Sequence, residues 1–88
     1  MAWTIEYSDR ADHDLARLDR QVARRIVDFM DSRIAASANP RATGAALSGD
    51  QKGLWRYRVG DYRVICDIRD AVVVVLVLRI GHRRQVYR

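Results

Sequence analysis

Two alternating segments separated by a glycine–aspartate pair constrain the fold of this chain more than any other feature. The segments at 54–59 and 62–68 alternate polar and apolar residues, and Gly60-Asp61 between them suits a two-residue hairpin turn. A further turn at Arg69-Asp70 leads into an almost entirely apolar segment, 72–80. We therefore predict three successive strands, with the apolar one in the centre of the sheet.

The N-terminal half predicts one short strand and two helices. Residues 3–7 alternate as a strand does, and Ser8 and Asp9 then supply N-cap chemistry. We predict helices at 9–18 and 20–37, with Asp19 capping the second; one long helix is the alternative. Apolar residues recur at helical spacing along both: Leu15, Leu18, Val22, Ile26, Phe29, Met30 and Ile34.

The order of these elements predicts a single small domain. Asn39-Pro40 ends the second helix, and residues 39–53 form a loop in which Leu47 is the expected anchor to the core. With 88 residues, the chain has room for one core, so we assign residues 1–88 to one domain. The predicted fold class is α+β: a small antiparallel sheet with two N-terminal helices on one face, in the order β-α-α-β-β-β.

Positive charge is concentrated in the C-terminal part of the chain. Residues 1–50 hold 7 Arg and 8 Asp+Glu (7 − 8 = −1), whereas residues 51–88 hold 9 Lys+Arg and 3 Asp+Glu (9 − 3 = +6), which together give the net charge of +5. The excess therefore falls on the predicted strands and the residues after them. Such segregation favours a polyanionic partner, most often a nucleic acid.

Strand parity predicts that three arginines gather on one face of the sheet. Arg56 and Arg58 point away from the apolar side of their strand, and Arg63 does so on the next strand. A two-residue turn places Arg58 opposite Arg63, and like charges in that position destabilise a sheet unless an anion binds them. The alternative is an ordinary solvated face on which Asp61 and Asp67 act as counterions.

Other residues carry weaker signals. Cys66 has no partner for an internal disulfide and shares the apolar parity of its strand, which predicts a core residue. No His, Cys or Asp spacing suggests a metal site, Trp3 and Trp55 are expected core aromatics, and His13 is an expected surface residue. We expect a cytoplasmic protein without a secretion signal or a membrane role, because the longest apolar run is too short to cross a bilayer.

The combination GLWRYRVGDYRVI, a Val-rich strand and GHRRQVY resembles the RelE branch of the RelE/ParE toxin superfamily, whose members are the toxins of bacterial toxin–antitoxin pairs. The resemblance covers essentially the whole chain. It implies a metal-free endoribonuclease without cofactors that enters the ribosomal A site and cuts mRNA. It also implies a RelB-like antitoxin that binds the toxin tightly and blocks its active face.

The resemblance also assigns site residues by position. Arg56 and Arg58 fall where RelE-like toxins carry two basic residues, often lysines, beside the scissile phosphate. Arg63 and Arg83 fall on two arginines of the family, and Tyr87 falls on its C-terminal tyrosine, which engages the mRNA base. Lys52, Arg84 and Arg88 are further candidates for RNA binding.

The implied reaction is an attack of the RNA 2′-OH on the adjacent phosphodiester, and it needs a base and an acid. Arginine suits the stabilisation of phosphorane charge but not proton abstraction, because a guanidinium stays protonated. His82 is the possible acid or base, because an imidazole can take up or release a proton near neutral pH, with an ordinary turn residue as the alternative. Two other functions stay open: a ParE-type toxin that inhibits DNA gyrase, and an RNA- or ribosome-binding module without catalysis.

Overall fold

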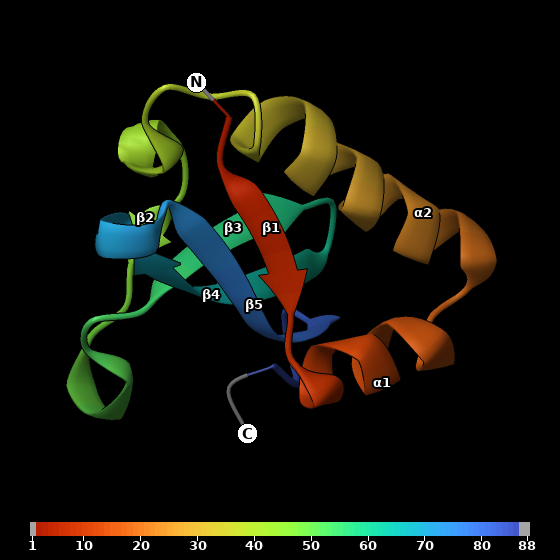
Figure 1. Ribbon diagram of the computed structural model, residues 1–88. Helices are drawn as coiled ribbons and strands as arrows, with labels where there is room; N and C mark the ends of the chain where they lie inside the picture. The colour runs from red at the N-terminus through yellow and green to blue at the C-terminus, as the bar shows by residue number, and fades with distance from the viewer. Residues whose placement is uncertain (1, 87–88) are drawn as a thin grey trace.

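The computed structural model describes residues 2–86 and has two helices on one side of a five-stranded sheet (Figure 1). The elements are β1 (Thr4–Tyr7), α1 (Asp9–Arg17), α2 (Arg20–Phe29) with a π-helical extension (Met30–Ile34), β2 (Ala45–Ala46), β3 (Trp55–Val59), β4 (Tyr62–Arg69) and β5 (Val74–His82). The strand order across the sheet is β1-β5-β4-β3-β2. The predicted fold class is confirmed.

Side-chain caps start both helices where the sequence predicts. The Ser8 hydroxyl accepts a hydrogen bond from the Ala11 N–H at 3.0 Å, and the Asp19 carboxylate accepts one from the Gln21 N–H at 3.0 Å. The chain therefore breaks between α1 and α2, and the alternative of one long helix is wrong. The second helical segment ends at Ile34, three residues earlier than predicted, after one π-helical turn.

The three C-terminal strands form the predicted meander, with a later start for the last one. Gly60 has a φ of +60°, which suits the tight turn between β3 and β4. The predicted strand at 72–80 begins only at Val74, because Asp70–Val72 forms a 3₁₀ turn and Val73 adopts a left-handed conformation. The strand then continues to His82.

One strand pair departs from the predicted antiparallel sheet. β4 is antiparallel to both β3 and β5, but β1 pairs with β5 in parallel, from Thr4 opposite Val74 to Tyr7 opposite Val77. The two hairpins fix the direction of β5, and β1 joins its remaining edge in the same direction. A two-residue strand, β2, also forms inside the predicted loop and pairs with β3.

The core lies between the helices and one face of the sheet. Cys66 is fully buried in it, and Trp3 and Trp55 pack against it, as predicted. Leu47 is only half-buried and lies outside the core cluster, so the predicted anchor is wrong. The buried core residues are Ala11, Ile26, Met30, Ile34, Tyr57, Val59, Val64, Cys66, Ile68, Val75, Val77 and Ile80.

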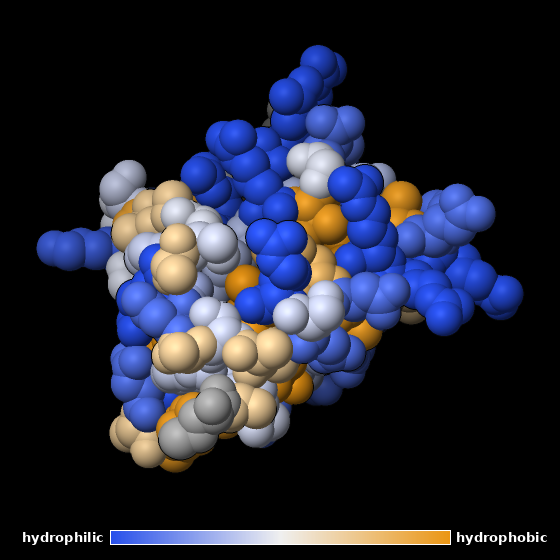
Figure 2. Space-filling model, turned by 90° about the horizontal axis from the view of Figure 1, so that it is seen from above, coloured by the Kyte–Doolittle hydropathy of each residue, from blue (hydrophilic) through white to orange (hydrophobic). Residues whose placement is uncertain are grey.

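The face of the molecule seen from above (Figure 2) carries many hydrophilic side chains. Figure 2 shows polar side chains projecting outward, with smaller hydrophobic areas between them. His13 is exposed on α1, as predicted. Within residues 2–86, the helices are all too short and too polar to cross a membrane.

Candidate nucleic-acid interface

The sheet face turned away from the helices carries a row that crosses three strands. Arg58 on β3 lies directly opposite Arg63 on β4, and Arg63 pairs in turn with Gly81 on β5. Tyr57 and Val59, the neighbours of Arg58 in the chain, are buried on the other face, whereas Arg58 is exposed. The register that the Gly60-Asp61 turn predicts is therefore confirmed.

The next row contains two further arginines. Arg56 on β3 pairs with Ile65 on β4, and Ile65 pairs with Arg79 on β5. Ile65 is only 1% exposed although it lies outside the core cluster, and arginine stems can cover apolar surface while their charged heads reach water. Because residues paired in this way share a face, we call the following four residues the arginine face: Arg56, Arg58, Arg63 and Arg79.

Arg79 is not among the residues predicted for this site, because simple alternation places it on the core side with Val77. A register shift changes this: Ile65 pairs with Arg79 but Cys66 pairs with Val77, which leaves Leu78 as an extra residue on β5. Such a bulge reverses the alternation of the strand beyond it. Arg79 therefore points to the same face as Arg56. The sequence itself gives no signal for this bulge.

Arg63 is buried and hydrogen-bonded to its own hairpin. Only 9% of the residue is exposed, and its Nη1 donates to the carbonyl oxygens of Tyr62 at 3.2 Å and Gly60 at 3.4 Å. These contacts fix the guanidinium beside the exposed side chain of Arg58. A charged group that is already oriented loses little conformational freedom when an anion binds.

Three of the four arginines of this face have no acidic partner among the described residues. The solvated-face alternative required Asp61 and Asp67 as counterions, but the carboxylate of Asp67 accepts from Arg69 Nε at 3.1 Å, and Asp61 forms no ion pair within residues 2–86. Among residues 2–86, no ion pair includes Arg56, Arg58 or Arg79. The Nε of Arg56 is buried and has no hydrogen-bond partner among the described residues. The face therefore carries concentrated positive charge.

Arg83 lies beside the tip of the β3–β4 hairpin. Its N–H donates to the carbonyl oxygen of Asp61 at 2.8 Å, and its side chain is exposed. This bond extends the pairing of β4 with β5 beyond the last strand residue. Arg83 is thus brought to the end of the sheet at which Arg58 and Arg63 lie.

His82 is not grouped with the arginine face. It pairs with Tyr62, one residue along from the Arg63–Gly81 pair, so its side chain lies on the opposite side of the sheet from Arg63. Its ring packs edge-on against Tyr62, with 5.7 Å between ring centroids. Its Nδ1 accepts from the Arg84 N–H at 3.3 Å, which leaves the proton of the neutral ring on Nε2.

The remaining candidates lie at the margins or beyond the described residues. Lys52 is exposed in the turn before β3, and Arg84 is exposed in the turn after β5. Tyr87 and Arg88 lie outside the described residues.

The described residues offer neither a reactive thiol nor a metal centre. Burial raises the pKa of the Cys66 thiol, and the nearby Asp67 carboxylate raises it further, so the thiol stays protonated at neutral pH. Within residues 2–86, no three His, Cys, Asp or Glu side chains lie close enough together to hold a metal ion. The arrangement is suited to binding an anion and stabilising its charge.

Comparisons with known proteins find similarity to toxins of toxin–antitoxin systems. A family model described as "ParE toxin of type II toxin-antitoxin system, parDE" matches residues 5–87. The chain is 30% identical to Toxin RelG of Mycobacterium tuberculosis over 88 residues, which covers 100% of this chain and 99% of that protein. It is 36% identical to Toxin RelE of the same organism over 78 residues, which covers 89% of this chain and 78% of that protein.

A solved structure shows the same fold. The crystal structure of the toxin–antitoxin complex RelBE2 from M. tuberculosis contains a chain that superposes with a TM-score of 0.86 at 26% identity. The superposition covers 94% of this chain and 100% of that one.

Proposed function

Because this chain belongs to the ParE toxin family of type II toxin–antitoxin systems, within the RelE/ParE superfamily, we propose that it is a ribosome-dependent mRNA endoribonuclease. Its substrate is mRNA presented in the ribosomal A site. The products are a 2′,3′-cyclic phosphate and a 5′-OH end, formed without a metal ion.

The Arg58–Arg63 pair is the observation that carries this proposal. Two arginines face each other across a ladder, where like charges destabilise the fold, and neither Arg58 nor its neighbour Arg56 has an acidic partner among residues 2–86. The cost to stability is offset when a phosphate lies between them. Arginine forks bind phosphate oxygens with two parallel hydrogen bonds, which favours a phosphodiester as the ligand.

In the proposed reaction, the 2′ oxygen attacks the adjacent phosphorus, and the bond from phosphorus to the 5′ oxygen breaks. The 2′-OH loses its proton, and the departing 5′ oxygen gains one. Arg63, held by its hairpin, and Arg58, beside it, donate to the non-bridging oxygens as negative charge builds up on the phosphorane. Arg83 provides a further donor at the same end of the sheet, and Arg56 provides another from the next row of the same face.

The site is better suited to stabilising charge than to transferring protons. His82 points to the other side of the sheet, so the proposal does not use it as the base. Tyr87 keeps the role that the family resemblance implies, as the residue that engages the mRNA base. Charge stabilisation and alignment of the 2′-OH then supply most of the rate, which explains a need for the ribosome to present the mRNA in a fixed geometry.

A RelB-like antitoxin is the proposed partner in the cell. The structural relative from M. tuberculosis was solved as a toxin–antitoxin complex, and this chain shares its fold over almost the whole length. An acidic or hydrogen-bonding segment laid across Arg58 and Arg63 would relieve their repulsion and cover the proposed site.

Inhibition of DNA gyrase is the second candidate, because the matching family model is described by the ParE toxin. A gyrase inhibitor acts by binding a protein and leaves mRNA intact. A supercoiling assay with purified gyrase separates the two functions.

The proposal is tested with purified toxin, freed of antitoxin, on a defined ribosomal initiation complex. Primer extension maps the mRNA ends for the wild type and for Arg58→Gln, Arg83→Gln and Tyr87→Phe. Arg24→Gln is the matched control, because Arg24 is exposed on α2 outside the arginine face. We expect cuts within the A-site codon and a loss of about 100-fold or more for Arg58→Gln, with normal cutting by the control. Intact mRNA with the wild-type toxin would overturn the proposal, and inhibited supercoiling would then support the gyrase alternative.

A further inference from the structure

A second basic site lies at the edge of the sheet, next to the arginine face. α1, the end of β5 and the residues that follow it enclose a hollow of about 300 Å³. Three arginines line it: Arg10 and Arg17 from α1, and Arg79 from β5. None of them is among the functional residues predicted from the sequence.

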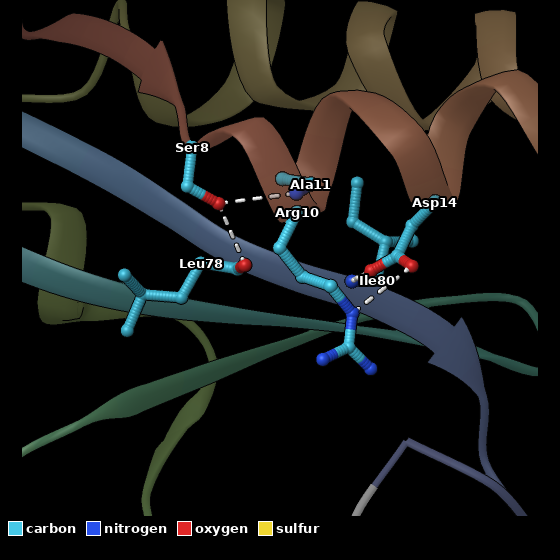
Figure 3. Close-up of polar contacts among 6 residues, drawn as sticks. All are labelled: Ser8, Arg10, Ala11, Asp14, Leu78 and Ile80. Carbon is cyan, nitrogen blue, oxygen red and sulfur yellow. Dashed lines mark hydrogen bonds and ion pairs between the residues drawn. The ribbon is translucent and has the colours of Figure 1, made fainter.

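The helix spacing explains why the two arginines of α1 reach this hollow. Arg10, Asp14 and Arg17 are four and three residues apart, so they share one face of the helix. Asp14 fixes this face of α1 against β5, because its Oδ2 accepts a hydrogen bond from the Ile80 N–H at 2.9 Å (Figure 3). Its Oδ1 accepts from Arg10 Nε at 3.4 Å.

The bulge of β5 supplies the third arginine. Leu78 is the extra residue, and its carbonyl oxygen accepts from the Ser8 hydroxyl at 2.8 Å (Figure 3). Ser8 and Asp14 therefore hold the strand on both sides of Arg79. Arg79, which the bulge turns to the arginine face, therefore also lines the hollow.

The charge of the hollow remains positive. Three arginines face one carboxylate, that of Asp14, so their formal charges give 3 − 1 = +2. Asp14 has only 15% of its side chain exposed and already accepts two hydrogen bonds. Within residues 2–86, neither Arg17 nor Arg79 takes part in an ion pair. These guanidinium groups stay available to an external anion.

We propose that Arg10, Arg17 and Arg79 form a second phosphate-binding site for the RNA backbone, continuous with the arginine face through Arg79. Together the two sites form a basic path that runs from β3 across β4 and β5 to α1. This inference rests on the proposed function, which makes RNA the ligand. The phosphate belongs either to mRNA next to the cleaved nucleotide or to ribosomal RNA around the A site.

The test measures binding rather than cleavage. The probes are a fluorescent single-stranded 2′-O-methyl oligoribonucleotide, which has no free 2′-OH and cannot be cut, and ribosomes without mRNA. Affinity is measured against salt concentration for the wild type, Arg17→Gln, Arg79→Gln and the control Arg24→Gln. Thermal melting confirms that each variant is folded.

We expect each test variant to bind about 10-fold more weakly or worse, irrespective of the oligonucleotide sequence. The logarithm of the association constant decreases linearly with the logarithm of the salt concentration. The slope of this decrease should become less steep by about 0.7 for each phosphate of the single strand that the variant no longer neutralises, while Arg24→Gln keeps the wild-type slope. Weaker binding to the oligonucleotide alone identifies mRNA as the source of the phosphate. Weaker binding to the ribosome alone identifies ribosomal RNA.

Unchanged affinities and slopes for both probes would overturn the inference, as would a wild-type toxin that binds neither probe. The proposed nuclease function is judged separately, by cuts in A-site mRNA. An altered slope together with uncut mRNA would support the second phosphate site and reject the nuclease.

Discussion

The Asp14 carboxylate accepts a hydrogen bond from the Ile80 N–H at 2.9 Å, and this contact joins residues 66 positions apart in the chain. It lies where β1 ends, so β5 no longer has a strand neighbour on that side. Ser8 bonds to the preceding stretch of the same edge, through its N–H to Val77 and its hydroxyl to Leu78. Helix α1 therefore replaces a strand along this edge and satisfies backbone groups that would otherwise need water or another chain.

Replacing Asp14 tests the importance of this contact for stability. Asp14→Ala leaves the partly buried Ile80 N–H without an acceptor, so we expect the free energy of unfolding to fall by about 1–3 kcal/mol. Asp14→Asn keeps an acceptor oxygen and should lose less. Urea unfolding of the purified toxin, followed by circular dichroism, measures both. Equal stability of Asp14→Ala and the wild type would mean that water satisfies this edge.

Arg58 is predicted to favour function at the expense of stability. Arg58→Gln removes one of two like charges that face each other across the β3–β4 ladder, so we expect the variant to be more stable by about 0.2–1 kcal/mol. The same variant should lose cleavage of A-site mRNA, as argued above for phosphate binding. Arg24→Gln, on the exposed side of α2, should change neither quantity. A variant that loses both stability and activity would show that Arg58 has a structural role instead.

The arginine face could be predicted in part because its signals are local. The Gly60-Asp61 turn sets the register of β3 and β4, and alternation then places Arg58 and Arg63 opposite each other. These relationships depend on residues adjacent in the sequence. The side of such a hairpin that faces away from the helices can therefore be deduced before the rest of the fold is known.

Arg79 and the parallel pairing of β1 depend on distant residues and could not be predicted in this way. The bulge at Leu78 is held by side chains of Ser8 and Asp14, about 65–70 residues earlier in the chain. The parallel pairing of β1 with β5 likewise joins residues from opposite ends of the chain. A one-residue shift in register moves a side chain to the other face, so a local pattern cannot decide such a position.

The Cys66 thiol is expected to be unreactive in the folded protein. It is fully buried, and burial raises its pKa, with a further increase from Asp67. Labelling with a thiol reagent at mildly alkaline pH should therefore be slow and limited by unfolding, and denaturant should make it fast. Asp14→Ala, if less stable as predicted above, should label faster than the wild type. Rapid labelling of the native toxin would contradict a buried thiol.

Arg41 and Asp70 form a two-pronged ion pair that predicts a specific dependence on pH. Arg41 Nη1 and Nη2 donate to the two carboxylate oxygens of Asp70, both at 2.9 Å, and these hydrogen bonds lower the pKa of Asp70 from its ordinary value of 3.8. A carboxyl group with a lowered pKa stabilises the folded state above its ordinary pKa. This contribution is lost as the pH falls through the lowered value.

Arg41→Gln should return the pKa of Asp70 towards 3.8, which an NMR titration of its carboxyl carbon measures directly. The wild type should be more stable than Arg41→Gln near neutral pH, and the difference should shrink as the pH falls below 3.8. Both groups are well exposed, so the difference will be small. Asp70→Asn is the matched control, because a further Arg41→Gln change in that background should have no such pH dependence. An Asp70 carboxyl that titrates at the same pH in the wild type and in Arg41→Gln would show that the ion pair does not form in solution.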